Sequence, residues 1–171
     1  MSININLAGI VRESITDGPG IRFSIFCQGC THKCEGCHNE QTWELNSGKD
    51  VSIIKLLEEI KKDGVLSGVT FTGGEPFLQA HAFYELGKMI KSETTLNIVA
   101  YTGYTYEELI NKKEEDIEGL LSVVDYLIDG KFIIKKRDLT LSFRGSGNQR
   151  IIDMNKTRKN GKLTLANEYM I

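Results

Sequence analysis

The chain has 171 residues, of which 40% are hydrophobic and 26% are charged, a composition typical of one soluble globular domain. Its 21 basic and 23 acidic residues leave a formal net charge of −2, so charge gives no case for a nucleic-acid-binding protein. The sequence contains no apolar run of about 18 residues and no signal-peptide pattern, so we expect no membrane span and a cytoplasmic location.

Hydrophobic periodicity predicts alternating strands and helices along the chain. In chain order we expect a strand at 21–27, a helix at 51–62, a strand at 69–72, a helix at 79–91, a strand at 96–101, a helical region across 105–122, a strand at 124–128 and a short strand at 150–153. This alternation predicts an α/β fold with a parallel sheet. A complete eight-unit barrel needs about 250 residues, so we expect an open, partial β/α barrel of four to six units.

The domain boundary is expected near residue 153. Residues 1–153 would form the partial barrel, and residues 154–171 a basic, peripheral C-terminal tail. Within 150–162, five basic residues face a single acidic residue. We expect this stretch to be a solvated surface, with a contact for an acidic partner as the alternative.

Four polar or glycine-rich motifs each follow a predicted strand. In chain order they are Cys27–Cys37, Gly73–Pro76, Tyr101–Tyr104 and Asp129–Lys131. Ligands of parallel α/β folds bind at the carboxyl ends of the strands. One such loop would be an ordinary turn, but four of them together with a cysteine cluster predict a single functional site.

All four cysteines lie between Cys27 and Cys37, whereas a disulfide framework spreads its cysteines along the chain. Their spacing therefore indicates a metal site or redox chemistry. Thiolates select iron–sulfur clusters, zinc or copper(I). The compact spacing favours an iron–sulfur cluster held by one loop over a zinc site with two separate knuckles, although His38 keeps a Cys3His zinc site as an alternative.

The triad Cys30-x3-Cys34-x2-Cys37, followed one βα unit later by Gly73-Gly74-Glu75-Pro76, resembles the radical S-adenosylmethionine (SAM) superfamily. The resemblance implies a partial barrel of the radical SAM type and one 4Fe–4S cluster with an open iron. Cys30, Cys34 and Cys37 would ligate the cluster and SAM would bind the open iron, while Cys27 would be buried and not a ligand. The residues implied in SAM binding are Gly36, Cys37, His38, Gly73, Gly74, Glu75 and Pro76.

Further motifs narrow the resemblance within that superfamily. Asp17–Arg22 and Cys37–Asn39 are similar to the activating enzymes of glycyl-radical enzymes. Asp129–Phe132 and Arg144–Arg150, together with Tyr101–Tyr104, resemble the branch that acts on anaerobic ribonucleotide reductases. This implies reductive SAM cleavage, removal of a hydrogen from a backbone glycine of the reductase large subunit, and an electron donor such as flavodoxin or ferredoxin.

The resemblance also suggests further contacts to SAM or to the glycine loop, with Thr102, Asp129, Lys131, Arg144 and Asn148 as the candidates. For Asp129 and Lys131 an ordinary turn at the end of a strand is an equally good interpretation, and for Arg144 and Asn148 the alternative is a polar turn. Three alternatives to the function stay open at this point: an activator of the formate-lyase type, a small-molecule radical SAM enzyme, and a non-catalytic iron–sulfur or zinc module.

Overall fold

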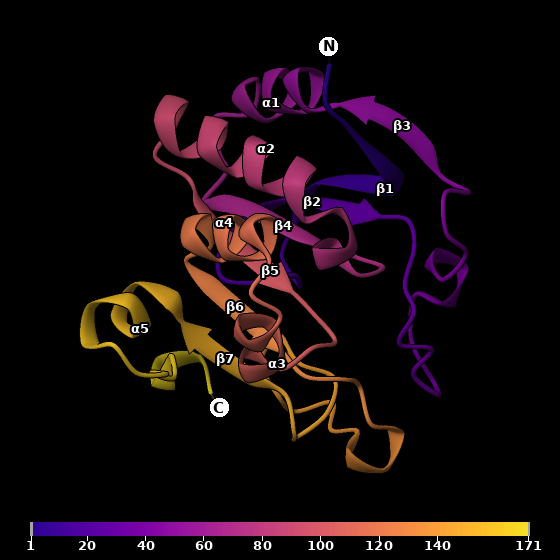
Figure 1. Cartoon of the computed structure of the whole chain (residues 1–171), viewed down its shortest axis with the longest axis vertical. Coiled ribbons are helices and arrows are strands. Elements are labelled where there is room, and N and C mark those ends of the chain that lie inside the picture. The colour runs from indigo at the N-terminus through magenta and orange to yellow at the C-terminus, as the bar shows by residue number, and fades with distance from the viewer. Residues whose placement is uncertain (1, 171) are drawn as a thin grey trace.

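The computed structural model describes residues 2–170 as one seven-stranded sheet with helices packed on it (Figure 1). The strands are β1 (Asn4–Ser14), β2 (Arg22–Cys27), β3 (Lys49–Ser52), β4 (Gly68–Gly73), β5 (Asn97–Tyr101), β6 (Tyr126–Asp129) and β7 (Arg150–Asp153). The helices are α1 (Ile53–Lys61), α2 (Ala80–Glu93), α3 (Tyr106–Asn111), α4 (Glu115–Val123) and α5 (Met154–Asn160). Every strand and helix predicted from the sequence is present.

The sheet is mixed, with the strand order β3-β1-β2-β4-β5-β6-β7. Its centre, β2-β4-β5-β6, is parallel, whereas β1 runs antiparallel to both β2 and β3, and β7 runs antiparallel to β6. The α/β class is confirmed, but the prediction of a parallel sheet is wrong for its edges. Residues 15–21 join β1 to β2 directly, and this link is too short for the crossover that a parallel pair requires.

Two strands were not predicted, and both lie at the same edge. β1 has a long exposed stretch over residues 8–13, so its sequence lacks the alternation of polar and apolar residues that marks a half-buried strand. β3 has four residues, none of them buried. The predicted helical region 105–122 is two helices, because Lys113 adopts a left-handed φ of 52° between α3 and α4.

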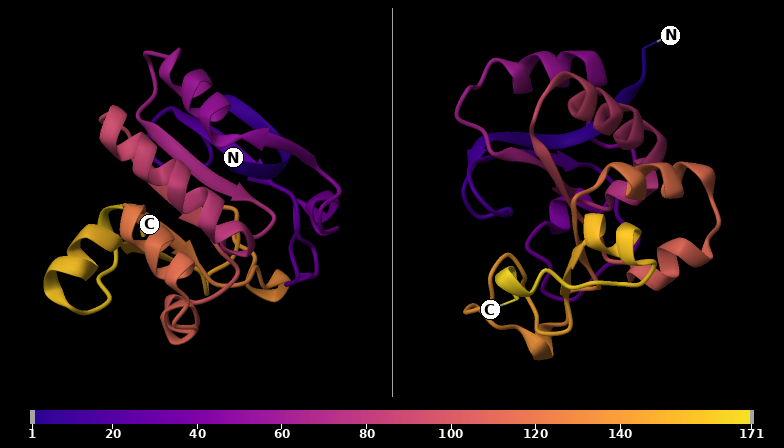
Figure 2. Two further views of the ribbon diagram at one scale, coloured as in Figure 1. Left: turned by 45° about the horizontal axis from the view of Figure 1, so that its top comes forward. Right: turned by 90° about the vertical axis from the view of Figure 1, so that its left-hand side faces the viewer.

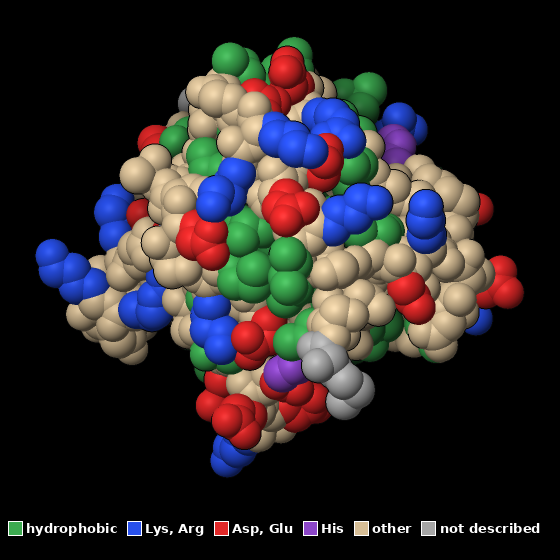
Figure 3. Space-filling model, turned by 90° about the horizontal axis from the view of Figure 1, so that it is seen from above, with side chains coloured by type: hydrophobic (Ala, Val, Ile, Leu, Met, Phe, Trp, Pro, Cys, Tyr) green, Lys and Arg blue, Asp and Glu red, His purple; other side chains and the backbone are tan. Residues whose placement is uncertain are grey.

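Helices α1, α2 and α4 cover one face of the sheet (Figures 1 and 2). Alternate strand residues point into this layer, and the rings of Phe71 on β4 and Phe83 on α2 lie 4.7 Å apart between centroids. Burial of each such side chain stabilises the fold by about 1.5–3 kcal/mol. Seen from above, the outer surface carries charged side chains around a central group of hydrophobic ones (Figure 3).

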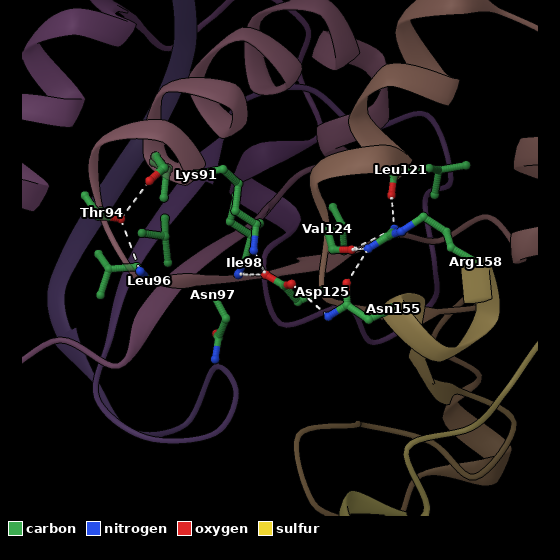
Figure 4. Close-up of polar contacts among 12 residues, drawn as sticks. Lys91, Thr94, Leu96, Asn97, Ile98, Leu121, Val124, Asp125, Asn155 and Arg158 are labelled. Atoms are coloured by element: carbon green, nitrogen blue, oxygen red, sulfur yellow. Dashed lines mark hydrogen bonds and ion pairs between the residues drawn. The ribbon is translucent and has the colours of Figure 1, made fainter. Parts of the chain in front are cut away.

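The other face of the sheet is covered in part by the end of the chain. Ala166 is fully buried with Val99, Ile128 and Ile151, and the backbone of Leu165 bridges to that of Ile152. A side-chain hydrogen bond connects α5 to the residue before β6: Asn155 Nδ2 donates to Asp125 Oδ1 over 3.0 Å (Figure 4). No helix within residues 2–170 is long and apolar enough to cross a membrane.

Candidate metal centre

The loops that follow the four parallel strands meet around one cavity of about 140 Å³. This confirms the prediction that the four motifs converge, since each of the four loops contributes to the lining. The lining residues are Cys30, His32, Cys34, Cys37, Asn39, Thr42, Trp43, Thr72, Gly73, Gly74, Tyr101, Thr102, Gly103, Gly130, Phe132 and Gln149. We call this cavity the cysteine pocket.

The loop after β2 presents three half-buried thiols to the pocket, those of Cys30, Cys34 and Cys37. Its start is held by two backbone hydrogen bonds, from Gly29 N to Thr42 O (2.7 Å) and from Cys30 N to Trp43 O (3.1 Å). The last two cysteines are tied by a bond from Cys37 N to Cys34 O of 3.1 Å. These hydrogen bonds fix the backbone at both ends of the cysteine loop.

Gly36 explains why no larger residue precedes the third cysteine. Its φ is 76°, in the left-handed region where glycine carries no steric cost. A Cβ there would also lie 2.8 Å from Cδ1 of Ile134. The cysteine loop therefore packs closely against the loop that follows β6.

Cys27 is separate from this group. It is the last residue of β2, is fully buried in the main hydrophobic core and does not line the pocket. Burial raises the pKa of its thiol well above the usual value. Burial also raises the pKa of the Cys30 and Cys34 thiols.

Gly73 and Gly74 form the wall of the pocket beside the cysteine loop. A Cβ on Gly73, whose φ is 96°, would lie 2.6 Å from Cys27 N, and one on Gly74 would lie 2.3 Å from Gly29 O. Gly74 N donates to Cys27 O over 2.8 Å. Glycine is required here because the two loops touch through their backbones.

Glu75 does not line the cavity but joins three of the loops around it. Its carboxylate is buried, and Oε2 accepts hydrogen bonds from Thr102 Oγ1 (3.0 Å) and Gly103 N (2.8 Å). His32 Nε2 lies 2.7 Å from the same oxygen and is the donor, because a carboxylate accepts. The remaining oxygen, Oε1, accepts from Phe77 N over 3.1 Å. We call Glu75 and these four donors the Glu75 hub.

Pro76 and His38 also lie outside the lining of the cysteine pocket. Pro76 is buried and begins a short 3-10 turn, Pro76–Gln79, for which Glu75 is the N-cap. The His38 ring lies 5.9 Å from the ring of Phe132 between centroids, in a tilted arrangement. Of the predicted SAM-binding residues, Cys37, Gly73 and Gly74 line the cysteine pocket in the described structure. Gly36 does not line it and packs against Ile134 and Phe132 instead.

The five further candidates for contacts to SAM or to the glycine loop lie in different places. Thr102 lines the cysteine pocket, whereas Asp129, Lys131 and Asn148 line a neighbouring cavity that shares Gly103 and Gly130 with it. Arg144 lines neither; its Nη1 donates to Gln149 O over 3.3 Å.

Asp129 is already paired within the fold. Arg150 Nη2 lies 2.5 Å from Asp129 Oδ2 and 2.7 Å from Glu107 Oε2, and Tyr106 N donates to Asp129 Oδ2 over 2.7 Å. These hydrogen bonds raise the pKa of Arg150 and, at the other end, lower that of Glu107. Asp129 thus holds the start of α3 and the strand β7 together.

Several lining residues were not assigned to the site from the sequence, among them Asn39, Thr42 and Thr72. Thr72 had a usable signal: Thr70 and Thr72 alternate with Val69 and Phe71, so they share the face opposite the helices. Asn39 and Thr42 are brought in by the turn after the cysteines, where Thr42 Oγ1 donates to Asn39 O over 2.6 Å. Sequence patterns do not reveal such a turn.

The donor set fits a four-iron cluster held by three thiols. Three cysteine side chains face one cavity from a single loop, and the fourth cysteine of the chain is buried elsewhere. Thiolates are the ligands that iron–sulfur clusters use. Within residues 2–170, no three His, Cys, Asp or Glu side chains stand close enough to hold one metal ion.

Comparison with known proteins defines the class of the chain. A family model described as a 4Fe-4S single cluster domain matches residues 16–152. This range contains the whole cysteine pocket and most of the sheet. The chain is thus an iron–sulfur protein with a single 4Fe–4S cluster domain.

Curated relatives identify the family more closely. The anaerobic ribonucleoside-triphosphate reductase-activating protein of Vibrio cholerae is 36% identical over 142 residues, which cover 79% of this chain and 89% of that protein. The proteins of the same name from Escherichia coli K12 and phage T4 are 35% and 34% identical, covering 79% of this chain and 90% and 85% of their own lengths. The chain belongs to the family of anaerobic ribonucleoside-triphosphate reductase-activating proteins.

A search of solved structures also found QueE from Escherichia coli. Its TM-score is 0.47 at 23% sequence identity, over 61% of this chain and 54% of that one.

Proposed function

We propose that this chain activates an anaerobic ribonucleoside-triphosphate reductase by generating a glycyl radical on it. The observation that carries the proposal is the cysteine pocket, where three thiols face a cavity and the fourth is excluded in the core. Three cysteine ligands leave one iron of a four-iron cluster without a protein thiolate. Family membership supports the same reaction, since the curated relatives are named as activators of this reductase.

The proposed cofactors are one 4Fe–4S cluster on Cys30, Cys34 and Cys37 and one molecule of SAM. These groups would supply the chemistry of reductive C–S cleavage, in which one electron would convert SAM to methionine and a 5′-deoxyadenosyl radical able to take a hydrogen atom from the target glycine. For SAM itself we propose a binding site built by Gly36, Cys37, His38, Gly73, Gly74, Glu75 and Pro76, in which the pocket-lining Cys37, Gly73 and Gly74 make direct contacts and the other four position them. The further candidates for this site are Thr102, Asp129, Lys131, Arg144 and Asn148.

The residues of the chain hold and enclose the reactants in this proposal. The close approach of Gly73 and Gly74 to the cysteine loop leaves backbone groups at the wall of the pocket. Glu75, which does not line the pocket, would act on SAM through the loops that it joins. Tyr101, Phe132 and Trp43 add aromatic walls that exclude water from a reactive radical.

The parallel centre of the sheet supports the proposed partial barrel of the radical SAM type. Its four strands, β2, β4, β5 and β6, carry all the loops that line the pocket. An incomplete barrel leaves the rim open to a peptide loop of a partner protein. An electron donor such as flavodoxin or ferredoxin and a cytoplasmic location remain predictions.

The test is SAM cleavage by the protein alone. The chain is reconstituted with iron and sulfide without oxygen, reduced, and assayed for methionine and 5′-deoxyadenosine, with Cys27→Ala and Cys30→Ala measured beside the parent. We expect cleavage by the parent and by Cys27→Ala, and loss of at least about a hundredfold in Cys30→Ala, because its cluster lacks a ligand. A parent that binds zinc and never takes up iron would refute the proposal.

The step on the partner is tested separately. The reductase is added to the reduced, SAM-loaded protein, and the glycyl radical is measured by electron paramagnetic resonance. A radical on the reductase is expected with the parent and not with Cys30→Ala. A parent that cleaves SAM but produces no radical on the reductase would contradict the proposed partner.

A further inference from the structure

The loop after β6 concentrates positive charge on a chain whose net charge is negative. Residues 131–139, which we call the basic loop, contain Lys131, Lys135, Lys136 and Arg137 against one acid, Asp138. Within residues 2–170 none of these four cations forms an ion pair. No carboxylate of the described residues is therefore paired with these four cations.

The basic loop also exposes large apolar side chains among its cations. Ile133 and Ile134 are 39% and 41% exposed, and Leu139 is 80% exposed. Apolar side chains surrounded by charge are typical of sites where another protein binds. A partner suited to this surface would offer acidic side chains next to apolar ones.

The position of the loop connects it to the proposed reaction. Phe132 lines the cysteine pocket, and Ile134 approaches Gly36 of the cysteine loop so closely that a Cβ on Gly36 would lie 2.8 Å from it. Figures 1 and 2 both show the loop beside the cysteine loop at the same edge of the molecule. The basic loop is therefore close enough to the pocket to contact a protein segment bound there.

The loop is held in one shape by hydrogen bonds to the segment before β7. Ile133 N donates to Ser146 Oγ (3.2 Å), Gly147 N donates to Lys136 O (2.9 Å), and Asn148 Nδ2 donates to Lys131 O (2.8 Å). Because its backbone is already ordered, binding a partner would cost little conformational entropy.

The basic stretch 150–162, considered as a docking site from the sequence, differs in this respect. Arg150 is paired with Asp129 and Glu107, and Lys156 with Asp153. Arg158 donates to the backbone oxygens of Leu121 and Val124. Much of its charge is thus used within the fold, while that of the basic loop is not.

We propose that the basic loop is the docking surface for the reductase segment that carries the target glycine, and that this segment is flanked by acidic and apolar side chains. The inference rests on the proposed function for the identity of the partner. Opposite charge accelerates the encounter of two proteins and fixes their register, and both effects weaken as salt is added.

The test compares two charge-reversed variants of the full, cluster-loaded chain. In the first, Lys135, Lys136 and Arg137 in the basic loop are replaced by glutamate. The matched control replaces Lys55, Lys159 and Lys162, which are also exposed and without ion pairs in the described structure, so both variants change the net charge equally. The dissociation constant for the whole reductase is measured for each protein over a range of salt concentrations.

We expect the loop variant to bind the reductase at least about tenfold more weakly than the parent and to lose most of its salt dependence, with the control within about twofold of the parent. A loop variant that binds like the parent would overturn the proposal. Equal weakening of both variants would also overturn it, because the effect would then come from net charge rather than from this surface.

A single substitution tests the apolar part of the basic loop, and a separate assay distinguishes failure of this proposal from failure of the proposed function. Leu139→Asp, at an exposed position, tests the apolar part of the surface and is expected to weaken binding by about three- to tenfold. SAM cleavage without the reductase is measured for every protein. If the parent fails to cleave SAM, the proposed function fails, whereas the ratio of the binding constants still decides whether the basic loop docks the reductase.

Discussion

Two buried carboxylates at opposite ends of the sheet organise this molecule in different ways. Asp125 lies just before β6, at the amino end of the parallel strands, and Glu75 lies just after β4, at the carboxyl end. Asp125 pairs with the cation of Lys91 and accepts from Ile98 N (2.7 Å) and Asn155 (Figure 4). Glu75 instead collects His32, Thr102 and backbone N–H groups from the loops around the cysteine pocket.

The partners explain what each carboxylate does. Those of Asp125 come from helices and strands, namely α2, β5 and α5, so the residue joins regular elements and its contribution is to stability. Those of Glu75 come from loops that carry pocket residues, so this residue determines where the loops stand. At the amino end of the parallel strands, Asp125 links helices and strands to one another. At the carboxyl end, Glu75 links the loops that surround the cysteine pocket.

The largest effect is expected from Glu75→Ala. Removal of the carboxylate leaves His32, Thr102 and Gly103 N without an acceptor in a buried place, which costs about 3–5 kcal/mol of unfolding free energy. The loops should also separate, so iron content after reconstitution should fall severalfold. Urea unfolding and iron analysis measure the two effects.

Glu75→Gln is the matched control for this substitution. It retains the shape and one carbonyl acceptor, so both losses should be smaller than in Glu75→Ala. If Glu75→Ala unfolds at the same urea concentration as the parent and binds as much iron, the Glu75 hub does not position the loops.

Asp125→Ala should lower the free energy of unfolding and leave the iron content of the cysteine pocket unchanged. Loss of the contacts to Lys91, Ile98 and Asn155 is expected to cost about 2–3 kcal/mol, because the acid is largely buried. Asp116→Ala, which removes an exposed pair with His81, should cost under about 1 kcal/mol. The iron content of Asp125→Ala should equal that of the parent at a temperature where both are folded. If Asp125→Ala loses as much iron as Glu75→Ala, the two carboxylates do not differ in their effect on the site.

The smallest of the three effects is expected from Gly103→Ala. The added Cβ would lie 2.4 Å from Cδ2 of His32, so the ring must move, at a cost of about 1–3 kcal/mol. Gly64→Ala, where a Cβ would meet nothing within 4 Å, should leave stability within about 0.5 kcal/mol of the parent. A change in the electron paramagnetic resonance spectrum of the reduced cluster should accompany Gly103→Ala and not Gly64→Ala. Identical spectra would show that His32 does not transmit the displacement to the cysteine loop.

The local patterns of the sequence predicted the central elements well. Strand β4 alternates Val69 and Phe71 with Thr70 and Thr72, and α1 repeats its apolar residues at helical spacing, so each element shows which side it buries. β1 was missed because residues 8–13 are largely exposed on the edge of the sheet. Such a strand forms through pairing with β2 and β3, which no local pattern reveals.

In the candidate site, too, local sequence predicted some features, and others depend on contacts between distant segments. The spacing of Cys30, Cys34 and Cys37, and their order with Gly73 and Gly74, are local features, and they predicted a shared pocket correctly. The direction of the Glu75 side chain was not predictable, because the three donors to its Oε2 atom are 27 to 43 residues away along the chain. The pairing of Asp129 with Arg150 likewise depends on β7 returning beside β6.

The sequence by itself determined the α/β class, the alternation of the central strands and helices, and the cysteine and glycine motifs, because each depends on residue types within a short stretch. The tertiary structure decided that the sheet is mixed, that Glu75 binds three loops without lining the cavity, and that the basic loop lies beside the cysteine pocket. These features arise from contacts between distant segments, where burial and hydrogen-bond satisfaction act together.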